Sequence, residues 1–434
     1  EMCIRVSTDT VLTLNLGGSP AAAGEWGADG SGAANTSLLI TGTGRINNLA
    51  GDTTALDIAF YDGGTVDIAP GGGNAASNQT AGGTWDATTK NWDIGFVDHA
   101  AWLNNLTSEA VFAGSISKTV TLGSDVNVGT MTMNSRNYKF NGSDTITFGP
   151  TGVIDANTDT NRTRLTEFNC DVAGGDITLN GTGFVRMDGA ATFSSFTMSG
   201  SGGVGELGTG TYNGFGPGLL TINSGRIFSQ NTGGEAGATI IPNNMVWNGN
   251  FILENVSESS KIVDFDGDVT LGANITVSAK HAVHLNGVIS DGGNNYQLTL
   301  QDSGGGADFH LNGANTFGGG VKWIEDNLTI NNAAGLGTGT FIIDASASTL
   351  DNKSGGPITV STANAQTWDK SFTFAGTNDL NLGTGPVTLT NNSGVTVNGG
   401  TLTIAGDIGQ SGTRGITKAG AGALALGGAN TYTG

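Results

Sequence analysis

A short alternation of residue types, repeated along most of the chain, constrains the fold more than any other feature. Aliphatic residues recur two positions apart with a polar residue between them, as in Val120-Thr-Leu122, Val283-His-Leu285 and Leu402-Thr-Ile404. Successive side chains of a strand point to opposite faces, so this alternation is typical of a strand with one buried face. No long stretch carries apolar residues at helical spacing. The sequence therefore predicts an all-β fold.

The residues between these runs are typical of tight turns. Asn-Gly pairs occur at positions 141, 180, 213, 248, 286, 312 and 398, and glycine accounts for 74 of the 434 residues. Both residue types tolerate the positive φ that sharp turns require. Strands this short argue against a β-sandwich, and the lack of a repeat of about 40 residues argues against a propeller.

The remaining architecture is a single-stranded parallel β-helix, an elongated β-solenoid. Each coil would supply two or three short strands, and equivalent residues of successive coils would stack about 4.8 Å apart into a continuous inward ladder. At about 20–25 residues per coil, the chain would form on the order of 17–21 coils.

An internal repeat supports a solenoid. Segment 311–318 aligns without gaps to 426–433, at an offset of 115 residues, and both copies contain Ala-Asn-Thr followed by an aromatic residue. Two short aliphatic runs precede each copy at similar distances. We expect such a repeat to return after a whole number of coils, about five.

Composition argues against several classes of partner. The chain has 17 Lys and Arg against 37 Asp and Glu, a formal net charge of −20. Binding of nucleic acid relies on clusters of Lys and Arg, so no nucleic acid is expected. No window approaches the ~20 apolar residues of a membrane helix, so no membrane insertion is expected. Cys3 and Cys170 lie in no metal or redox motif, and a disulfide, an intermolecular bond and two free thiols all remain open.

The C-terminal sequence carries a specific motif. Residues 417–434 read Thr-Lys-Ala-Gly-Ala-Gly-Ala-Leu-Ala-Leu-Gly-Gly-Ala-Asn-Thr-Tyr-Thr-Gly, and related segments precede them at 366–374 and 395–402. This region resembles the autotransporter-associated (passenger-associated) β-strand repeat. Residues 83–135, which contain three tryptophans, resemble the tryptophan-marked opening segment of such proteins.

The resemblance implies a domain organisation and a role. We expect 1–82 to be an N-terminal β-rich segment that forms the first coils or a cap, 83–135 to be the opening segment, and 136–434 to be the β-helix, with the strongest match over 245–434. The resemblance implies a secreted, right-handed β-helix on a bacterial cell surface, which serves as a stalk, adhesin or scaffold. It implies no catalytic residues in the repeat, and we expect no enzyme activity, cofactor or metal.

The C-terminal coil has neither a charge nor a helix over 421–428 to cap it. Terminal coils of a solenoid expose unpaired backbone groups, and capping elements normally cover them. We therefore expect this end to meet another β-surface, either the next segment of a longer chain or a second copy in a head-to-tail filament. The expected end surface consists of Leu424, Leu426, Asn430, Thr431 and Tyr432.

A second hypothesis is a secreted polysaccharide-active β-helix enzyme, a lyase or glycosidase. Such enzymes need clustered carboxylates or an acid–base pair. The candidate groups, which as surface polar residues need no catalytic role, are Asp98-His99, His281, His284 with Lys280, and His310 with Asp308.

The run Asp264-Phe-Asp266-Gly-Asp268 departs from the EF-hand template, because Val269 and Ile275 occupy positions six and twelve. We interpret it as a solvated acidic turn.

A third hypothesis is a glycan-binding adhesin. Trp85, Trp92 and Trp102 would form its stacking platform, and the alternative is that they cover an end or side of the solenoid. Asn also recurs just before turn glycines. Stacked Asn side chains hydrogen-bond to the coils above and below, so we expect the asparagines to be structural.

Overall fold

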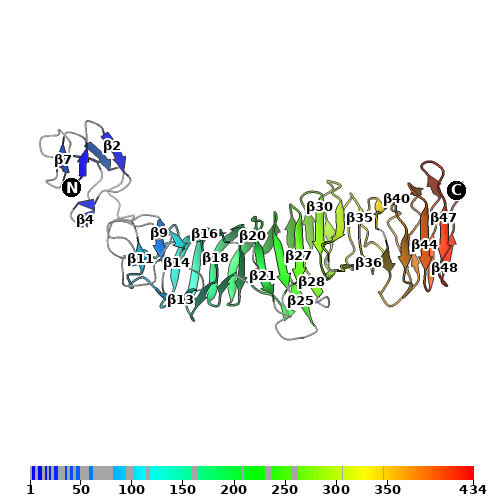
Figure 1. Cartoon of the computed structure of the whole chain (residues 1–434), viewed down its shortest axis with the longest axis horizontal. Coiled ribbons are helices and arrows are strands. Elements are labelled where there is room, and N and C mark those ends of the chain that lie inside the picture. The colour runs from blue at the N-terminus through cyan, green and yellow to red at the C-terminus, as the bar shows by residue number, and fades with distance from the viewer. Residues whose placement is uncertain are drawn as a thin grey trace. The chain divides into compact units, whose positions relative to one another are not determined.

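The computed structural model describes residues 82–93, 101–113, 118–158, 165–207, 210–229, 237–255, 262–304, 306–345 and 347–434, together with nine short strands within residues 1–81. The chain divides into two compact units, Glu1–Ala59 and Phe60–Gly434. Figure 1 shows both units, coloured from blue at the N-terminus to red at the C-terminus.

The described strands of the first unit mix parallel and antiparallel pairing. One two-stranded pair is parallel, the other is antiparallel, and the four-stranded sheet has the order β2-β8-β5-β6 with antiparallel pairing of β5 and β8. These strands are β1 (Met2–Ile4), β2 (Thr8–Val11), β3 (Asn15–Leu16), β4 (Ser19–Pro20), β5 (Gly24–Gly27), β6 (Asn35–Thr36), β7 (Ile40–Gly42) and β8 (Arg45–Asn48).

The second unit is a parallel β-solenoid, in which a strand pairs with the equivalent strand one coil later (Figure 1). The exception lies at its start, where Trp92 and Asp93 pair antiparallel with Tyr61 and Phe60. Its longest sheet has 15 strands. They are β10 (Gly83–Trp85), β13 (Lys118–Leu122), β15 (Tyr138–Asn141), β17 (Thr166–Phe168), β19 (Phe184–Met187), β21 (Gly203–Leu207), β24 (Arg226–Ser229), β27 (Phe251–Asn255), β30 (Ile275–Ala279), β33 (Leu298–Asp302), β35 (Val321–Trp323), β37 (Phe341–Ile343), β40 (Gln366–Trp368), β43 (Val387–Leu389) and β46 (Ile408–Gln410).

Three further sheets form the other faces of the solenoid. An 11-stranded sheet contains β11 (Trp92–Asp93), β9 (Ile58–Tyr61), β12 (Glu109–Phe112), β14 (Val126–Met133), β16 (Thr145–Ala156), β18 (Asp171–Gly181), β20 (Ala191–Met198), β23 (Leu219–Ile222), β26 (Met245–Trp247), β29 (Val269–Leu271) and β32 (Ile289–Ser290). A 10-stranded sheet contains β22 (Gly210–Thr211), β25 (Ala238–Ile241), β28 (Ile262–Phe265), β31 (Ala282–Leu285), β34 (Asp308–Leu311), β36 (Asn327–Ile330), β38 (Ser348–Asp351), β41 (Phe372–Phe374), β44 (Ser393–Val397) and β47 (Ile416–Ala419). The C-terminal four-stranded sheet contains β39 (Ile358–Thr359), β42 (Leu380–Asn381), β45 (Thr401–Ile404) and β48 (Ala423–Leu426).

The cross-section of the coil changes along the solenoid. Early coils contain long strands such as β16, whose 12 residues shift register between Thr147 and Thr151. Gly149 and Pro150 lie at this irregularity, where a residue without an N–H is tolerated. A Cβ on Gly149 would lie 2.5 Å from the carbonyl oxygen of Leu106. Close backbone approach therefore requires glycine at this position.

The core consists of columns of inward side chains stacked in register. One column of the 15-stranded sheet runs Val277, Leu300, Trp323, Ile343, Trp368 and Leu389, and all six side chains are fully buried. The described residues contain no helix. The predicted all-β parallel β-helix, with alternating inward aliphatic residues, is therefore confirmed.

The predicted coil length is confirmed, whereas the predicted number of coils was too high. Fourteen steps from Gly83 to Ile408 along the 15-stranded sheet correspond to about 23 residues per coil. The 17–21 coils expected from the sequence require the whole chain to wind into the solenoid. Residues 1–59 instead belong to a separate unit, and so they add no coils.

The internal repeat does not return after a whole number of coils, contrary to expectation. Leu311 ends β34 in the 10-stranded sheet, whereas Leu426 ends β48 in the C-terminal four-stranded sheet. Its asparagine nevertheless has the same local role in both copies. Asn315 Oδ1 accepts a hydrogen bond from Ile289 N at 2.8 Å, and Asn430 Oδ1 accepts one from Ile408 N at 3.0 Å. The asparagine of the repeat therefore makes the same side-chain hydrogen bond to the previous coil, although the two copies lie on different sheets.

Truncation within an inward column should destabilise the solenoid far more than truncation beside it. We expect Leu300→Ala to lower the free energy of unfolding by about 2–5 kcal/mol, because it leaves a cavity between Val277 and Trp323. The outward neighbour Thr299 provides the control, since Thr299→Ala should change stability by about 0.5 kcal/mol or less. Urea unfolding followed by circular dichroism measures both variants. Equal losses would contradict the assignment of Leu300 to the core.

Candidate functional site

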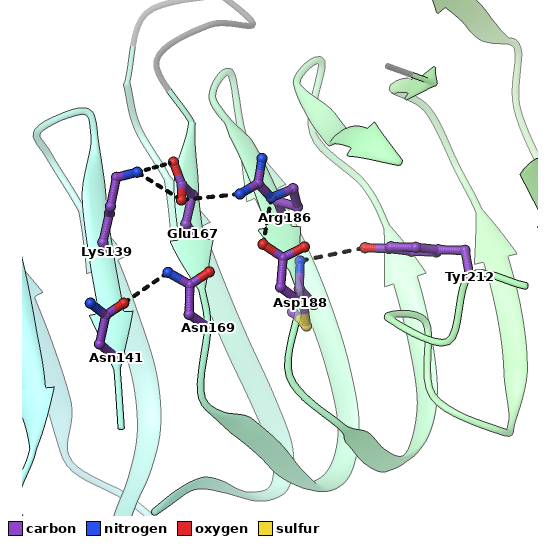
Figure 2. A network of polar contacts seen from close by, with 8 residues as sticks. Lys139, Asn141, Glu167, Asn169, Arg186, Asp188 and Tyr212 are labelled. Atoms are coloured by element: carbon purple, nitrogen blue, oxygen red, sulfur yellow. Dashed lines mark hydrogen bonds and ion pairs between the residues drawn. The ribbon is translucent and has the colours of Figure 1, made fainter. Parts of the chain in front are cut away.

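Charged residues on the outer face of the 15-stranded sheet form a column across three coils. Lys139 on β15 and Arg186 on β19 lie in register on either side of Glu167 on β17. Lys139 Nζ lies 2.9 Å from Glu167 Oε1, and Arg186 Nη2 lies 3.1 Å from Glu167 Oε2 (Figure 2). Arg186 Nε also pairs with Asp188 Oδ2 at 2.7 Å. The signs alternate along the column, so each charge is neutralised by its neighbours.

This column borders a shallow depression of about 360 Å³ lined by Asp188, Tyr212 and Asn213, among others. The Tyr212 hydroxyl accepts a hydrogen bond from the backbone N–H of Met187 at 3.4 Å (Figure 2). Burial raises the pKa of this hydroxyl, so it stays protonated. Exposed ion pairs of this kind contribute about 0–1 kcal/mol each, and we assign the column a structural role. Sequence reasoning missed it, because the sequence does not show which charges of successive coils lie in register.

Asparagine side chains stack between successive coils, before turn glycines as expected and also at positions without a following glycine. Asn286 Nδ2 donates to Asp266 Oδ1 at 2.7 Å, Asn312 Nδ2 to Asn286 Oδ1 at 2.6 Å, and Asn331 Nδ2 to Asn312 Oδ1 at 2.9 Å. A second pair, in which Asn169 donates to Asn141 at 2.8 Å, lies beside the charged column (Figure 2). The predicted structural role of these asparagines is confirmed.

Two histidines named from the sequence come together on the outer face of the 10-stranded sheet. His284 on β31 and His310 on β34 are in register, and their ring centroids lie 4.3 Å apart. Each imidazole pairs with a carboxylate. His284 Nδ1 lies 2.8 Å from Asp264 Oδ1, and His310 Nε2 lies 3.1 Å from Asp308 Oδ2. His284 points outward, as its alternation with the buried Val283 and Leu285 predicts, and His310 does so between the buried Phe309 and Leu311.

Asp308 is the most strongly perturbed carboxylate of this group. Burial raises its pKa, but the hydrogen bond from His310 and the ammonium of Lys353 outweigh burial and bring the pKa to about 2. Lys353 Nζ lies 2.9 Å from Asp308 Oδ2. Asp308 is therefore ionised at neutral pH. Its charge orients the His310 ring.

His281 lies apart from this pair and is fully buried. Neither ring nitrogen has a hydrogen-bond partner. Burial disfavours the charged imidazolium and lowers the pKa of His281 to about 4. Its neighbour Lys280 is half-buried. His281 is therefore a neutral core residue at physiological pH.

The acidic turn at 264–268 joins neighbouring coils. Asp266 accepts from Asn286, and Asp268 Oδ1 accepts from Val288 N at 2.8 Å. Among the residues that the structure describes, no three His, Cys, Asp or Glu side chains gather in an arrangement that could hold a metal ion. The carboxylates of this turn therefore have structural partners on the next coil.

The three tryptophans pack together at the start of the solenoid. Trp85 and Trp92 are fully buried and Trp102 is 3% exposed. The ring centroids of Trp92 and Trp102 lie 4.5 Å apart, and those of Trp85 and Trp92 lie 5.3 Å apart. Trp102 Nε1 donates to Asn127 O at 2.8 Å. This burial leaves no open indole face for a sugar, and it favours the interpretation that the tryptophans cover the end of the solenoid.

The expected end surface lies on the last described coil. Leu424 and Leu426 pair with Leu402 and Ile404, which are fully buried, but are themselves half-exposed. The reason is geometric, because strands β46, β47 and β48 pair with described strands on one side only.

The other residues of this end surface are exposed to different degrees. Asn430 and Thr431 are exposed, and Tyr432 is half-exposed. Asn430 Oδ1 and Thr431 N both bind the backbone of Ile408, at 3.0 and 2.9 Å. These two residues thus belong to the coil that they close.

Two remaining sequence predictions have different outcomes. Asp98-His99 lies outside the described residues, and so does the side chain of Cys3. Cys170 is a free, buried thiol. Burial raises its pKa to about 12, so it is neither a thiolate nor a nucleophile at neutral pH.

Comparison with protein-family models, with curated proteins and with solved structures finds no match to this chain. Among the described residues no helix is long and apolar enough to cross a membrane. Geometry and sequence motifs alone therefore support any assignment of function.

The neutral, buried state of His281 should make the protein sensitive to acid. The pKa of His281 is about 4 when folded and about 6.5 when unfolded, so the unfolded chain binds the extra proton between these values. We expect the free energy of unfolding to fall by up to about 3 kcal/mol between pH 6.5 and pH 4, and to be unaffected by this group above pH 6.5.

Urea unfolding at several pH values measures this loss. His281→Leu should remove it, whereas His284→Gln, at an outward position, should retain it. Nuclear magnetic resonance provides a direct measurement, because the chain has only four histidines. A His281 ring signal that titrates near pH 6.5 would contradict the assignment.

Proposed function

We propose that this protein is a secreted structural rod of a bacterial cell surface, a β-helical stalk or a head-to-tail extracellular filament. The supporting observation is the continuity of the stacked columns. Apolar side chains form uninterrupted inward columns, and stacked asparagines and paired charges join successive coils on the outside. Such contacts are nearest-neighbour and additive, so they produce a long, stiff and stable element.

The edge of the last described coil supports an end-to-end role. Strands β46, β47 and β48 offer backbone groups on one side, and Leu424 and Leu426 offer half-exposed apolar surface beside them. A further coil of a longer chain, or the β-surface of a second copy, would pair with these edges. The motif at 417–434, which resembles the autotransporter-associated repeat, supports the cell-surface location.

Electron microscopy of the purified chain tests this proposal. Fifteen strands at about 4.8 Å correspond to a solenoid about 70 Å long, and we expect rods of this length to join end to end as the protein concentration rises. The double variant Leu424→Lys and Leu426→Lys should prevent joining, because edge lysines block strand pairing. The double variant Thr384→Lys and Thr388→Lys adds the same charge at exposed positions elsewhere and should join normally.

Antibody labelling of intact producing cells tests the location. Rods that stay separate at every concentration would contradict the filament hypothesis and would remain consistent with a stalk. A lack of labelling on intact cells, with labelling after lysis, would contradict both.

A second candidate function is a polysaccharide-active enzyme, which one specific observation favours. Asp264–His284 and Asp308–His310 form two stacked acid–base pairs on one outward face. We expect that incubation with acidic polysaccharides would release unsaturated or reducing products if this function holds. His284→Ala and His310→Ala should then abolish the release, whereas Thr373→Ala on the same sheet should not. Product formation that survives both histidine variants would exclude this pair as the acid–base groups.

A further inference from the structure

A polar depression lies where the 15-stranded and 10-stranded sheets meet near the C-terminal end of the solenoid. Its volume is about 510 Å³, and it is formed by equivalent turns of successive coils, between β37 and β38, β40 and β41, β43 and β44, and β46 and β47. It is lined by Ala347, Asp369, Lys370, Ser371, Asn391, Asn392 and Arg414.

Two cations of this depression, unlike several cations elsewhere on the solenoid, have no carboxylate partner among the described residues. Within the described residues, Lys139, Arg186, Arg226, Lys322 and Lys353 each pair with a carboxylate. Neither Lys370 nor Arg414 forms an ion pair with a described carboxylate. The Nε of Arg414 is also shielded from solvent and has no hydrogen-bond partner. A shielded donor without a partner costs free energy, and an anion bound here would remove that cost.

The one carboxylate of the lining is already engaged. Asp369 Oδ1 accepts hydrogen bonds from Thr390 Oγ1 at 2.9 Å and from Asn391 Nδ2 at 2.8 Å. These bonds, that of Thr390 foremost, lower the pKa of Asp369, which is therefore ionised. Two cations and one anion leave the lining with one net positive charge, in a chain whose net charge is −20.

The neutral groups of the lining keep one end of each side chain available. Ser371 Oγ accepts from Gly394 N at 2.8 Å, which leaves its O–H to donate. Asn392 Oδ1 accepts a hydrogen bond from Gly415 N at 3.0 Å, which leaves the Asn392 NH₂ group to donate to a ligand. The NH₂ group of Asn391 donates to Asp369, which leaves the Asn391 side-chain oxygen to accept from a ligand. The rim therefore offers both donors and acceptors. A sugar hydroxyl, which both donates and accepts, matches such a rim.

We propose that this depression binds an acidic glycan, with the carboxylate of a uronate unit paired to Lys370 and Arg414 and its hydroxyls bonded to Ser371, Asn391 and Asn392. The four stacked turns form an open surface, so that a chain of sugars extends beyond the depression. This site goes beyond the proposed role as a rod and does not depend on it, because its residues belong to turns of one chain, and Lys370 lies two coils before the edge strands β46 and β47.

Isothermal titration calorimetry on the full chain tests the site with four probes: the tetramers of galacturonate and of mannuronate, a neutral galactose tetramer, and inorganic phosphate. We expect at least one uronate tetramer to bind and the neutral tetramer to bind at least about tenfold more weakly. Lys370→Gln and Arg414→Gln should each weaken uronate binding about tenfold or more, since each removes a charge-assisted contact. Lys418→Gln removes the same charge from an exposed residue that bonds only to nearby carbonyl oxygens, and should bind as the parent does.

Circular dichroism and thermal unfolding of each variant show whether weaker binding comes from a lost contact or from a lost fold. If Arg414→Gln is unfolded, the binding of Lys370→Gln alone tests the proposal. Three outcomes would overturn the proposal. The first is that neither uronate binds at concentrations up to about 10 mM. The second is that Lys418→Gln weakens binding as much as Lys370→Gln does. The third is that phosphate binds as tightly as the uronate tetramers, which would leave an anion site without sugar recognition.

Discussion

Backbone pairing between successive coils, in parallel and in register, is the interaction on which the rest of this structure depends. It places each residue directly over its equivalent about 4.8 Å away. Any side chain is therefore packed between two neighbours of the same position, and the protein becomes a set of columns. Inside, the column from Val277 to Leu389 excludes water without a gap. Outside, the same spacing determines which polar residues can occupy successive coils.

Stacking at this distance favours some residue types over others. Asn donates and accepts, so identical side chains support one another, as at Asn286, Asn312 and Asn331. Like charges in one column would repel, and in the column of Lys139, Glu167 and Arg186 the signs alternate. This constraint is consistent with a composition in which charged residues make up only 12% of the chain.

Side chains at the corners of the solenoid are not all stacked in register, because the turns vary in length. A turn residue therefore need not lie over an equivalent residue of the previous coil. Among the described residues, His281 is buried at one corner without a hydrogen-bond partner, and Lys370 and Arg414 lie at another without a paired carboxylate. In this molecule the rod is a property of the strands, whereas the ligand-binding capacity that we propose is a property of the turns.

The alternation of aliphatic and polar residues determined the strands, their inward faces and the parallel solenoid, because these features depend only on local periodicity and turn chemistry. The same pattern predicted the outward position of His284 and the stacking of the asparagines. The tertiary structure decided which residues meet across coils. His284 and His310 are 26 residues apart, Lys139 and Glu167 are 28 apart, and Glu167 and Arg186 are only 19 apart, yet each pair is in register. Since coil length varies with every turn, a fixed period cannot identify such partners. The lengths of all the intervening turns also determine on which sheet the second copy of the repeat lies. They likewise bring Lys370 and Arg414 into the same depression.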